Sequence, residues 1–214
     1  MKKLFDMDNP IVRFMGRVGD LIVLNALFIV CSLPLVTVGA SLTAMIKVIQ
    51  GILLGSEPGM FKTFFRAFRK NFVQATAAWL ILAALTAAMG YNLALVGANF
   101  TGGPAACLKY LMCALLVVLL AAAGYIFPLI ARYENSLRQH LLNALILAIA
   151  KLPRTLCVTA LNVLPAALAY FSMRIFLYSI AVWVLVGFAA LCWLDCLLLR
   201  PVLRQLEQPA PDRS

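Results

Sequence analysis

The sequence predicts an all-α fold, a polytopic bundle of transmembrane helices, and three observations support this prediction. Of the 214 residues, 64% are hydrophobic and only 12% are charged, whereas an ordinary soluble domain is about half apolar and a quarter charged. The apolar residues form stretches close to the roughly 20 residues that a helix needs to cross a bilayer. Basic residues lie mainly between these stretches. We therefore expect one membrane domain over residues 1–214, because a soluble fold would leave much of this apolar surface in water.

Six apolar stretches predict the membrane segments. Pro34 interrupts the first near its end, and Arg200-Pro201 ends the last, because proline cannot continue the hydrogen bonding of a helix. The second stretch is short and carries Lys47, so a tilted or re-entrant segment is an alternative to a full span there. The expected segments cover residues 20–38, 39–54, 72–98, 108–130, 155–173 and 176–199.

Two amphipathic segments predict helices that lie in the cytoplasmic interface, at residues 57–71 and 134–151. In the first, phenylalanines recur at helical spacing while basic residues fall on another face. This pattern is typical of a helix with its rings in the acyl boundary and its cations at anionic headgroups. The second is interfacial or the bent start of the fifth span. The expected contacts to anionic lipid are Lys62, Arg66, Arg69 and Lys70.

The distribution of basic residues predicts the orientation. With the N-terminus inside and six segments across, most Lys and Arg side chains fall on the cytoplasmic side, as the positive-inside rule requires. The opposite orientation would invert this bias. The net charge of +10 is then explained without nucleic acid as a partner, and both termini are expected to be cytoplasmic.

Charged and polar residues within the spans are the candidate functional site. Asp20, Lys47 and Asp195 are costly at membrane depth unless they pair, face a cavity or reach the interface. We expect Lys47 to pair with Asp195, with Asp20 as the other carboxylate within reach. Snorkelling, or the lining of a substrate or proton path, are the alternatives. We also expect hydrogen bonds between helices from three amides in different spans, those of Asn25, Asn92 and Asn162.

Sequence motifs give no sign of catalysis. The chain has no G-x-x-x-x-G-K-[ST], no G-x-S-x-G and no H-E-x-x-H. His140 is the single histidine, and the six cysteines contain no C-x-x-C. We therefore expect no catalytic residue, no cofactor and no metal site, and a protein that is not an enzyme.

Several blocks of the sequence resemble the YesL family of bacterial membrane proteins. They cover residues 9–10, 20–21, 24–25, 31–40 and 43–44, then 61–72, then 125–133 and 151–155, in the expected order. The resemblance implies a small multi-pass protein of unknown biochemical activity in the bacterial cytoplasmic membrane. Members of the family are often found beside carbohydrate-uptake and carbohydrate-degradation systems, including binding-protein-dependent sugar importers. The family supplies no catalytic residues.

The function predicted from these observations is that of a non-enzymatic accessory or partner subunit associated with carbohydrate uptake. Its expected partners are the lipid bilayer and the permease of a carbohydrate ABC importer. The alternative is a small solute transporter or channel, with Lys47 and Asp195 lining its path. The sequence predicts no substrate and no oligomeric state.

Overall fold

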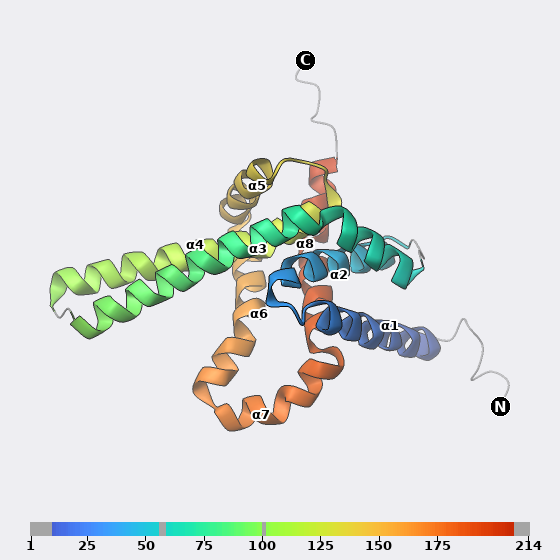
Figure 1. Cartoon of the computed structure of the whole chain (residues 1–214), viewed down its shortest axis with the longest axis horizontal. Coiled ribbons are helices and arrows are strands. Elements are labelled where there is room, and N and C mark those ends of the chain that lie inside the picture. The colour runs from blue at the N-terminus through green and yellow to red at the C-terminus, as the bar shows by residue number, and fades with distance from the viewer. Residues whose placement is uncertain (1–9, 56–58, 100–101, 208–214) are drawn as a thin grey trace, which may run out of the picture.

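The computed structural model describes residues 10–55, 59–99 and 102–207, and almost all of this part of the chain is helical, as the sequence predicts (Figure 1). The helices follow one another with short connections and no strand among the described residues. In chain order they are α1 (Pro10–Cys31), the 3₁₀ turn η2 (Leu35–Thr37), α2 (Val38–Leu53), α3 (Met60–Asn99), α4 (Gly103–Arg132), α5 (Leu137–Ala150), α6 (Leu152–Phe171), α7 (Met173–Val182), the π-helical turn η3 (Trp183–Gly187) and α8 (Phe188–Glu207).

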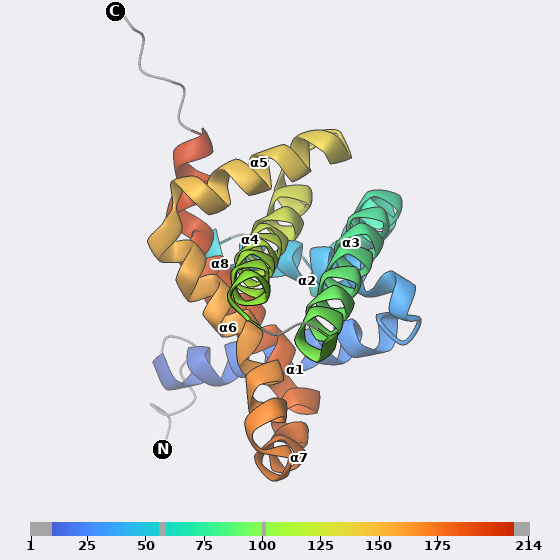
Figure 2. The ribbon, with the colours of Figure 1, turned by 90° about the vertical axis from the view of Figure 1, so that its left-hand side faces the viewer.

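Two sets of helices cross at a steep angle. α3 and α4 form a long antiparallel hairpin, and α6 and α8 run across its base in both views (Figures 1 and 2). α2 lies where these sets meet and contacts α3, α4 and α8. Ten of its sixteen residues are buried, which makes it the central helix of the core.

Close packing between α2 and α3 depends on Gly39. A Cβ atom at this position would lie 2.3 Å from the carbonyl oxygen of Ala75 and 2.6 Å from the Cβ of Trp79. The indole N–H of Trp79 donates to the carbonyl oxygen of Leu35 at 2.9 Å. This contact ties α3 to the turn that precedes α2.

Four helical segments are long and apolar enough to cross a membrane, namely Leu35–Leu53, Met60–Asn99, Ala106–Arg132 and Leu177–Leu203. α5 and the first part of α6 would provide a fifth span, but they are bent by 108° at Lys151. These segments support the prediction that the chain is a membrane protein. The predicted number of six membrane segments is not confirmed. The first, residues 20–38, is not one helix: α1 ends at Cys31 and Pro34 precedes η2, which leads into α2.

The two predicted interfacial segments belong to longer helical arrangements. Residues 60–71 are continuous with the third predicted span in the single 40-residue helix α3. α5 is a separate helix that begins at a capping box, in which Ser136 and Gln139 satisfy each other's backbone N–H groups. The bend after α5 agrees with the alternative that residues 134–151 are the bent start of a span.

Asn25 connects α1 to the irregular turn before α8. Its amide nitrogen donates to the carbonyl oxygens of Trp183 and Val184 at 3.1 and 2.7 Å, and its oxygen accepts from the N–H of Ala189 at 3.0 Å. A π-helical turn misaligns the ordinary hydrogen-bond ladder, so one buried amide satisfies backbone groups on both sides of the irregularity. The predicted hydrogen bond between helices is confirmed for Asn25, while Asn92 binds only Ala88 of its own helix.

Candidate functional site

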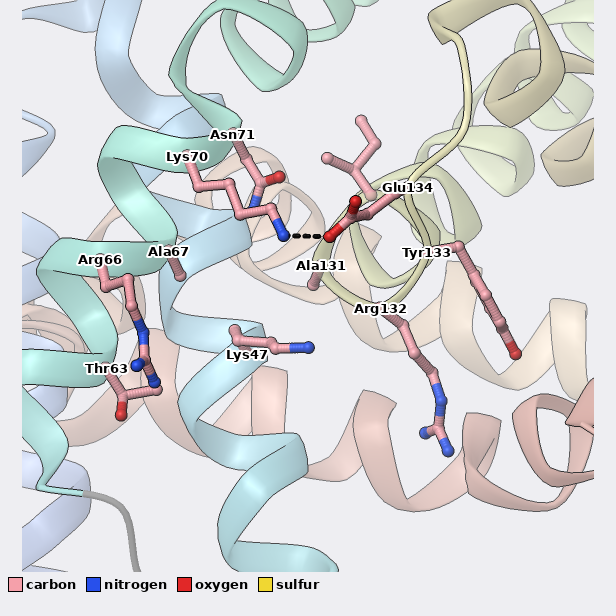
Figure 3. Close-up of a pocket in the computed structure, with 11 residues that line it drawn as sticks. Lys47, Thr63, Arg66, Ala67, Lys70, Asn71, Ala131, Arg132, Tyr133 and Glu134 are labelled. Carbon is pink, nitrogen blue, oxygen red and sulfur yellow. Dashed lines mark hydrogen bonds and ion pairs between the residues drawn. The ribbon is translucent and has the colours of Figure 1, made fainter.

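The candidate site is a cavity of about 190 Å³ that lies between α2, the first turns of α3 and the end of α4 (Figure 3). α2 directs Lys47 into this space, and α3 contributes Arg66 and Lys70 one turn apart. Arg132 closes the cavity at the end of α4, and Glu134 follows it in the connection to α5. Polar side chains of Thr63 and Asn71 complete the lining with Ala67, Ile130, Ala131 and Tyr133.

The charges around this cavity are unbalanced. Four cations and one carboxylate line it, a formal excess of three positive charges. The carboxylate of Glu134 forms an ion pair with the ammonium of Lys70. This hydrogen bond, with the charge of Lys70, holds the pKa of Glu134 below its usual range. Glu134 is therefore ionised at neutral pH and already engaged with one of the four cations.

A second contact fixes the same connection. The side-chain amide of Gln74 on α3 donates to the carbonyl oxygen of Asn135 at 2.6 Å. Together with the ion pair between Lys70 and Glu134, it ties α3 to the segment between α4 and α5. The mouth of the cavity is thus held by residues about 60 positions apart in the chain.

Asp195 lies at a different place, in a mainly apolar cavity of about 230 Å³. Its Oδ2 accepts a hydrogen bond from the Asn162 amide at 2.8 Å, which joins α8 to α6. Its Oδ1 is buried and has no hydrogen-bond partner among the described residues. The cavity is lined by apolar side chains from α1, α2, α3, α4 and α8, among them Phe28, Met45, Trp79 and Phe127.

Part of the chain matches the model of a known protein family. The model of a protein family of unknown function, DUF624, matches residues 21–93. Residues 21–93 of the chain are thus similar to the DUF624 family. This domain is the one found in YesL-type proteins, so the resemblance seen in the sequence is confirmed. No curated protein and no solved structure matches the chain.

The matched DUF624 residues include only part of the site. They contain Lys47, Arg66 and Lys70, whereas Arg132 and Glu134 lie beyond the match. The cavity is therefore built by the residues matched to DUF624 together with the end of α4. The family description assigns no chemistry to these residues.

The structure does not bring Asp20, Lys47 and Asp195 together. Asp20 is exposed on α1, and the Lys47 and Asp195 side chains line separate cavities. The predicted pair of Lys47 with Asp195 is replaced by the Asn162–Asp195 hydrogen bond, because α8 turns Asp195 toward α6 and α2 turns Lys47 toward α3 and α4. The transporter alternative needs a path lined by both Lys47 and Asp195, and no single cavity among the described residues contains both side chains.

The four predicted lipid contacts on α3 are all exposed, as such contacts require. Lys62, Arg66 and Arg69 surround a shallow hollow with Phe61 and Phe65. Arg66 and Lys70 also line the Lys47 cavity. Sequence reasoning missed Arg132 and Glu134 as site residues, because a basic residue at the end of a span is explained by topology alone.

Proposed function

We propose that this protein is a non-enzymatic membrane subunit that binds a partner membrane protein through the distal part of the α3–α4 hairpin. The partner that we propose is the permease of a carbohydrate ABC importer in the cytoplasmic membrane of a bacterium. The observation that carries the proposal is burial: between Leu82 and Ala121, none of the described residues is buried. This half of the hairpin contributes little to the core of its own chain: among its described residues, Leu119 is the partly buried side chain that packs against the core.

The hairpin is long enough for a substantial contact. Its arms, residues 83–99 and 103–120, contain 17 and 18 residues by their bounds, or about 25 Å each at a rise of 1.5 Å per residue. In Figure 1 they project beyond the remaining helices. Each arm packs against the other and leaves its remaining faces for lipid or for another protein.

One face of the α3 arm suits a helix rather than lipid. Ala84, Ala87 and Ala88, which we call the alanine face, are all exposed and lie at the i, i+3 and i+4 spacing of one helix side. Small residues let two backbones approach closely and are typical of helix contacts in membranes. Tyr91, 67% exposed, continues this face by one turn. A transmembrane helix of the partner would bury these residues.

The choice of a carbohydrate importer as the partner rests on the resemblance to YesL-type proteins. YesL-type proteins are often found beside carbohydrate-uptake systems, and residues 21–93 of the chain are similar to the domain of this type. A subunit of such a system needs a contact within the membrane and no reaction of its own. The exposed hairpin supplies a surface for that contact.

Co-purification from native membranes tests the proposal. The tagged protein should retain the importer permease, identified by mass spectrometry, and Ala84→Leu combined with Ala88→Leu should reduce the yield of the permease at least about tenfold. Both alanines are exposed, so the double variant should fold. The matched control is Ala114→Leu, an exposed alanine on the other arm, which should retain the permease.

Two results would contradict the proposal. Retention of the permease by the double variant at the wild-type level would remove the alanine face from the contact. Solute flux through liposomes that contain this protein alone would favour the transporter alternative instead.

A further inference from the structure

We propose that the Lys47 cavity binds a phosphate group, supplied by the headgroup of an anionic phospholipid or by a soluble phosphorylated compound. This site lies at the base of α3, at the opposite end from the hairpin tip. Its test is therefore independent of the partner contact proposed above.

Lys47 is the residue that most needs a counter-ion. Its neighbours along α2, Ile46 and Val48, are buried, and its own side chain is half-buried. Its ammonium has no hydrogen bond or ion pair with a described residue, and the carboxylate that lines the same cavity is bound to Lys70. A cation removed from much of its water requires an opposite charge nearby.

The donors around Lys47 match a phosphate group. Arg66 and Arg132 carry forked N–H donors that suit phosphate oxygens; their guanidinium groups extend away from Lys47 on opposite sides (Figure 3) and would turn inward around a bound phosphate. The ammonium groups of Lys47 and Lys70 add point charges, and the Asn71 amide adds a neutral donor. Without Arg132, which has a further interaction of its own, the lining cations Lys47, Arg66 and Lys70 exceed the carboxylate of Glu134 by two charges. This excess favours a phosphate, which carries up to two negative charges, over a single carboxylate.

The size of the cavity agrees with this ligand. A water molecule needs about 10–15 Å³ of such space, so a cavity of about 190 Å³ accommodates a five-atom phosphate group and several waters. The remainder of a larger molecule would extend outward, because the ion pair between Lys70 and Glu134 at the rim is exposed.

The surroundings make both sources of phosphate accessible. Phe61 and Phe65 on the same end of α3 are 58% and 45% exposed, and Lys62, Arg66 and Arg69 lie around them. Such a mixture of rings and cations suits the headgroup level of a membrane. A soluble compound would reach the same cavity from the aqueous side.

The test uses the full chain and two probes. Binding of inorganic phosphate is measured by the shift in thermal unfolding in a non-ionic detergent, against sodium chloride at matched ionic strength. Binding of phosphatidylglycerol is measured by native mass spectrometry after reconstitution in phosphatidylcholine nanodiscs. Phosphate binding without lipid selectivity assigns a soluble compound, and retention of phosphatidylglycerol assigns a headgroup.

Variants locate the binding. Lys47→Gln should weaken either interaction at least about tenfold, the loss expected for one charge-assisted hydrogen bond. Arg66→Gln should do the same and serves if Lys47→Gln fails to fold, because Arg66 is exposed. Arg69→Gln is the matched control, an exposed arginine on the same helix outside the cavity, and should change the affinity less than about twofold.

Glu134→Gln provides a result that a purely structural role would not give. It removes the carboxylate that competes with the ligand for Lys70, so the affinity for the bound probe should rise about threefold or more. Absence of binding to either probe would overturn the proposal. Equal losses for Lys47→Gln and Arg69→Gln would also overturn it, because they would indicate attraction to the whole basic surface.

Discussion

Replacing Asn25 with leucine tests how α1 is held against α8. The leucine side chain has nearly the same size as that of asparagine but no hydrogen-bonding group. The substitution would leave the carbonyl oxygens of Trp183 and Val184 and the N–H of Ala189 without the partner that the structure gives them. Asn25 is fully buried, so protein atoms cover the positions that water would need.

The magnitude follows from the three hydrogen bonds. Side-chain hydrogen bonds in a membrane protein contribute about 0.6 kcal/mol each on average and up to about 1.7 kcal/mol. Three of them give a loss of about 2 kcal/mol, with an upper limit of about 5 kcal/mol. The buried position favours the upper part of this range, because unsatisfied buried groups cost about 1–3 kcal/mol each.

The assay is reversible unfolding in mixed micelles with increasing dodecyl sulfate, followed by circular dichroism. Asn92→Leu is the matched control, since the Asn92 side chain is exposed and donates only to Ala88 of its own helix; its free energy of unfolding should change by less than about 0.5 kcal/mol. Equal stability of Asn25→Leu and Asn92→Leu would refute the reasoning. The π-helical turn would then hold its backbone without the amide of α1.

Two further predictions concern the α2–α3 contact and the rim of the cavity. Gly39→Ala should destabilise the protein by about 1–3 kcal/mol in the same unfolding assay, because the new Cβ would clash with α3. Gly90→Ala is the control and should not destabilise the protein, because no atom lies within 4 Å of the added Cβ. Equal losses of stability for the two variants would contradict the close packing of α2 against α3 at Gly39. Because Lys70 lowers the pKa of Glu134, the folded pKa lies below the unfolded one. The stabilisation from this pair is therefore present above the unfolded pKa and is lost as the pH falls through the folded pKa. The stability difference between the wild type and Glu134→Gln should shrink as the pH is lowered from 7 to 3, and a constant difference would argue against the pair.

The sequence predicts the helical class and the membrane character because both depend on local composition. A run of about 20 apolar residues has few stable alternatives to a helix in lipid. Pro34 likewise marks a real break, because it lies between the end of α1 and the turn η2. These predictions need no knowledge of neighbouring helices. The prediction that Arg200-Pro201 ends the last helix is wrong, since Pro201 lies inside α8, which continues to Glu207.

The sequence also contains the information needed to predict that α3 is one continuous helix. A change from amphipathic to apolar character near Phe72 suggested a boundary between an interfacial helix and a span. However, no proline or glycine lies between Met60 and Met89, so nothing in the backbone ends the helix there. A change of environment along a helix is different from a break in it.

The partners of Lys47 and Asp195 could not be predicted, because they depend on rotation and on lateral position. Depth along a span follows from sequence position, and by depth Asp195 was a reasonable partner for Lys47. The rotation of α8 decides instead that Asp195 meets Asn162. The rotation of α2 decides that Lys47 meets α3 and the end of α4. Both are set by packing of the whole bundle.

Three cations of the cavity are used in two separate arguments, namely Arg66, Lys70 and Arg132. They line the proposed phosphate site, and they also count toward the predicted cytoplasmic bias of basic residues. A phosphate site would explain these three side chains without any reference to topology. The predicted orientation does not depend on them, because the remaining basic residues keep the same bias. Lys47 differs from Arg66 and Lys70 in burial: it is half-buried on the central helix α2, whereas those two side chains are exposed. A cation deep in a span costs up to about 2.5–3.5 kcal/mol. A phosphate ligand would account for the cations that line this cavity, and Lys47 is the residue whose substitution separates a binding site from a topological signal.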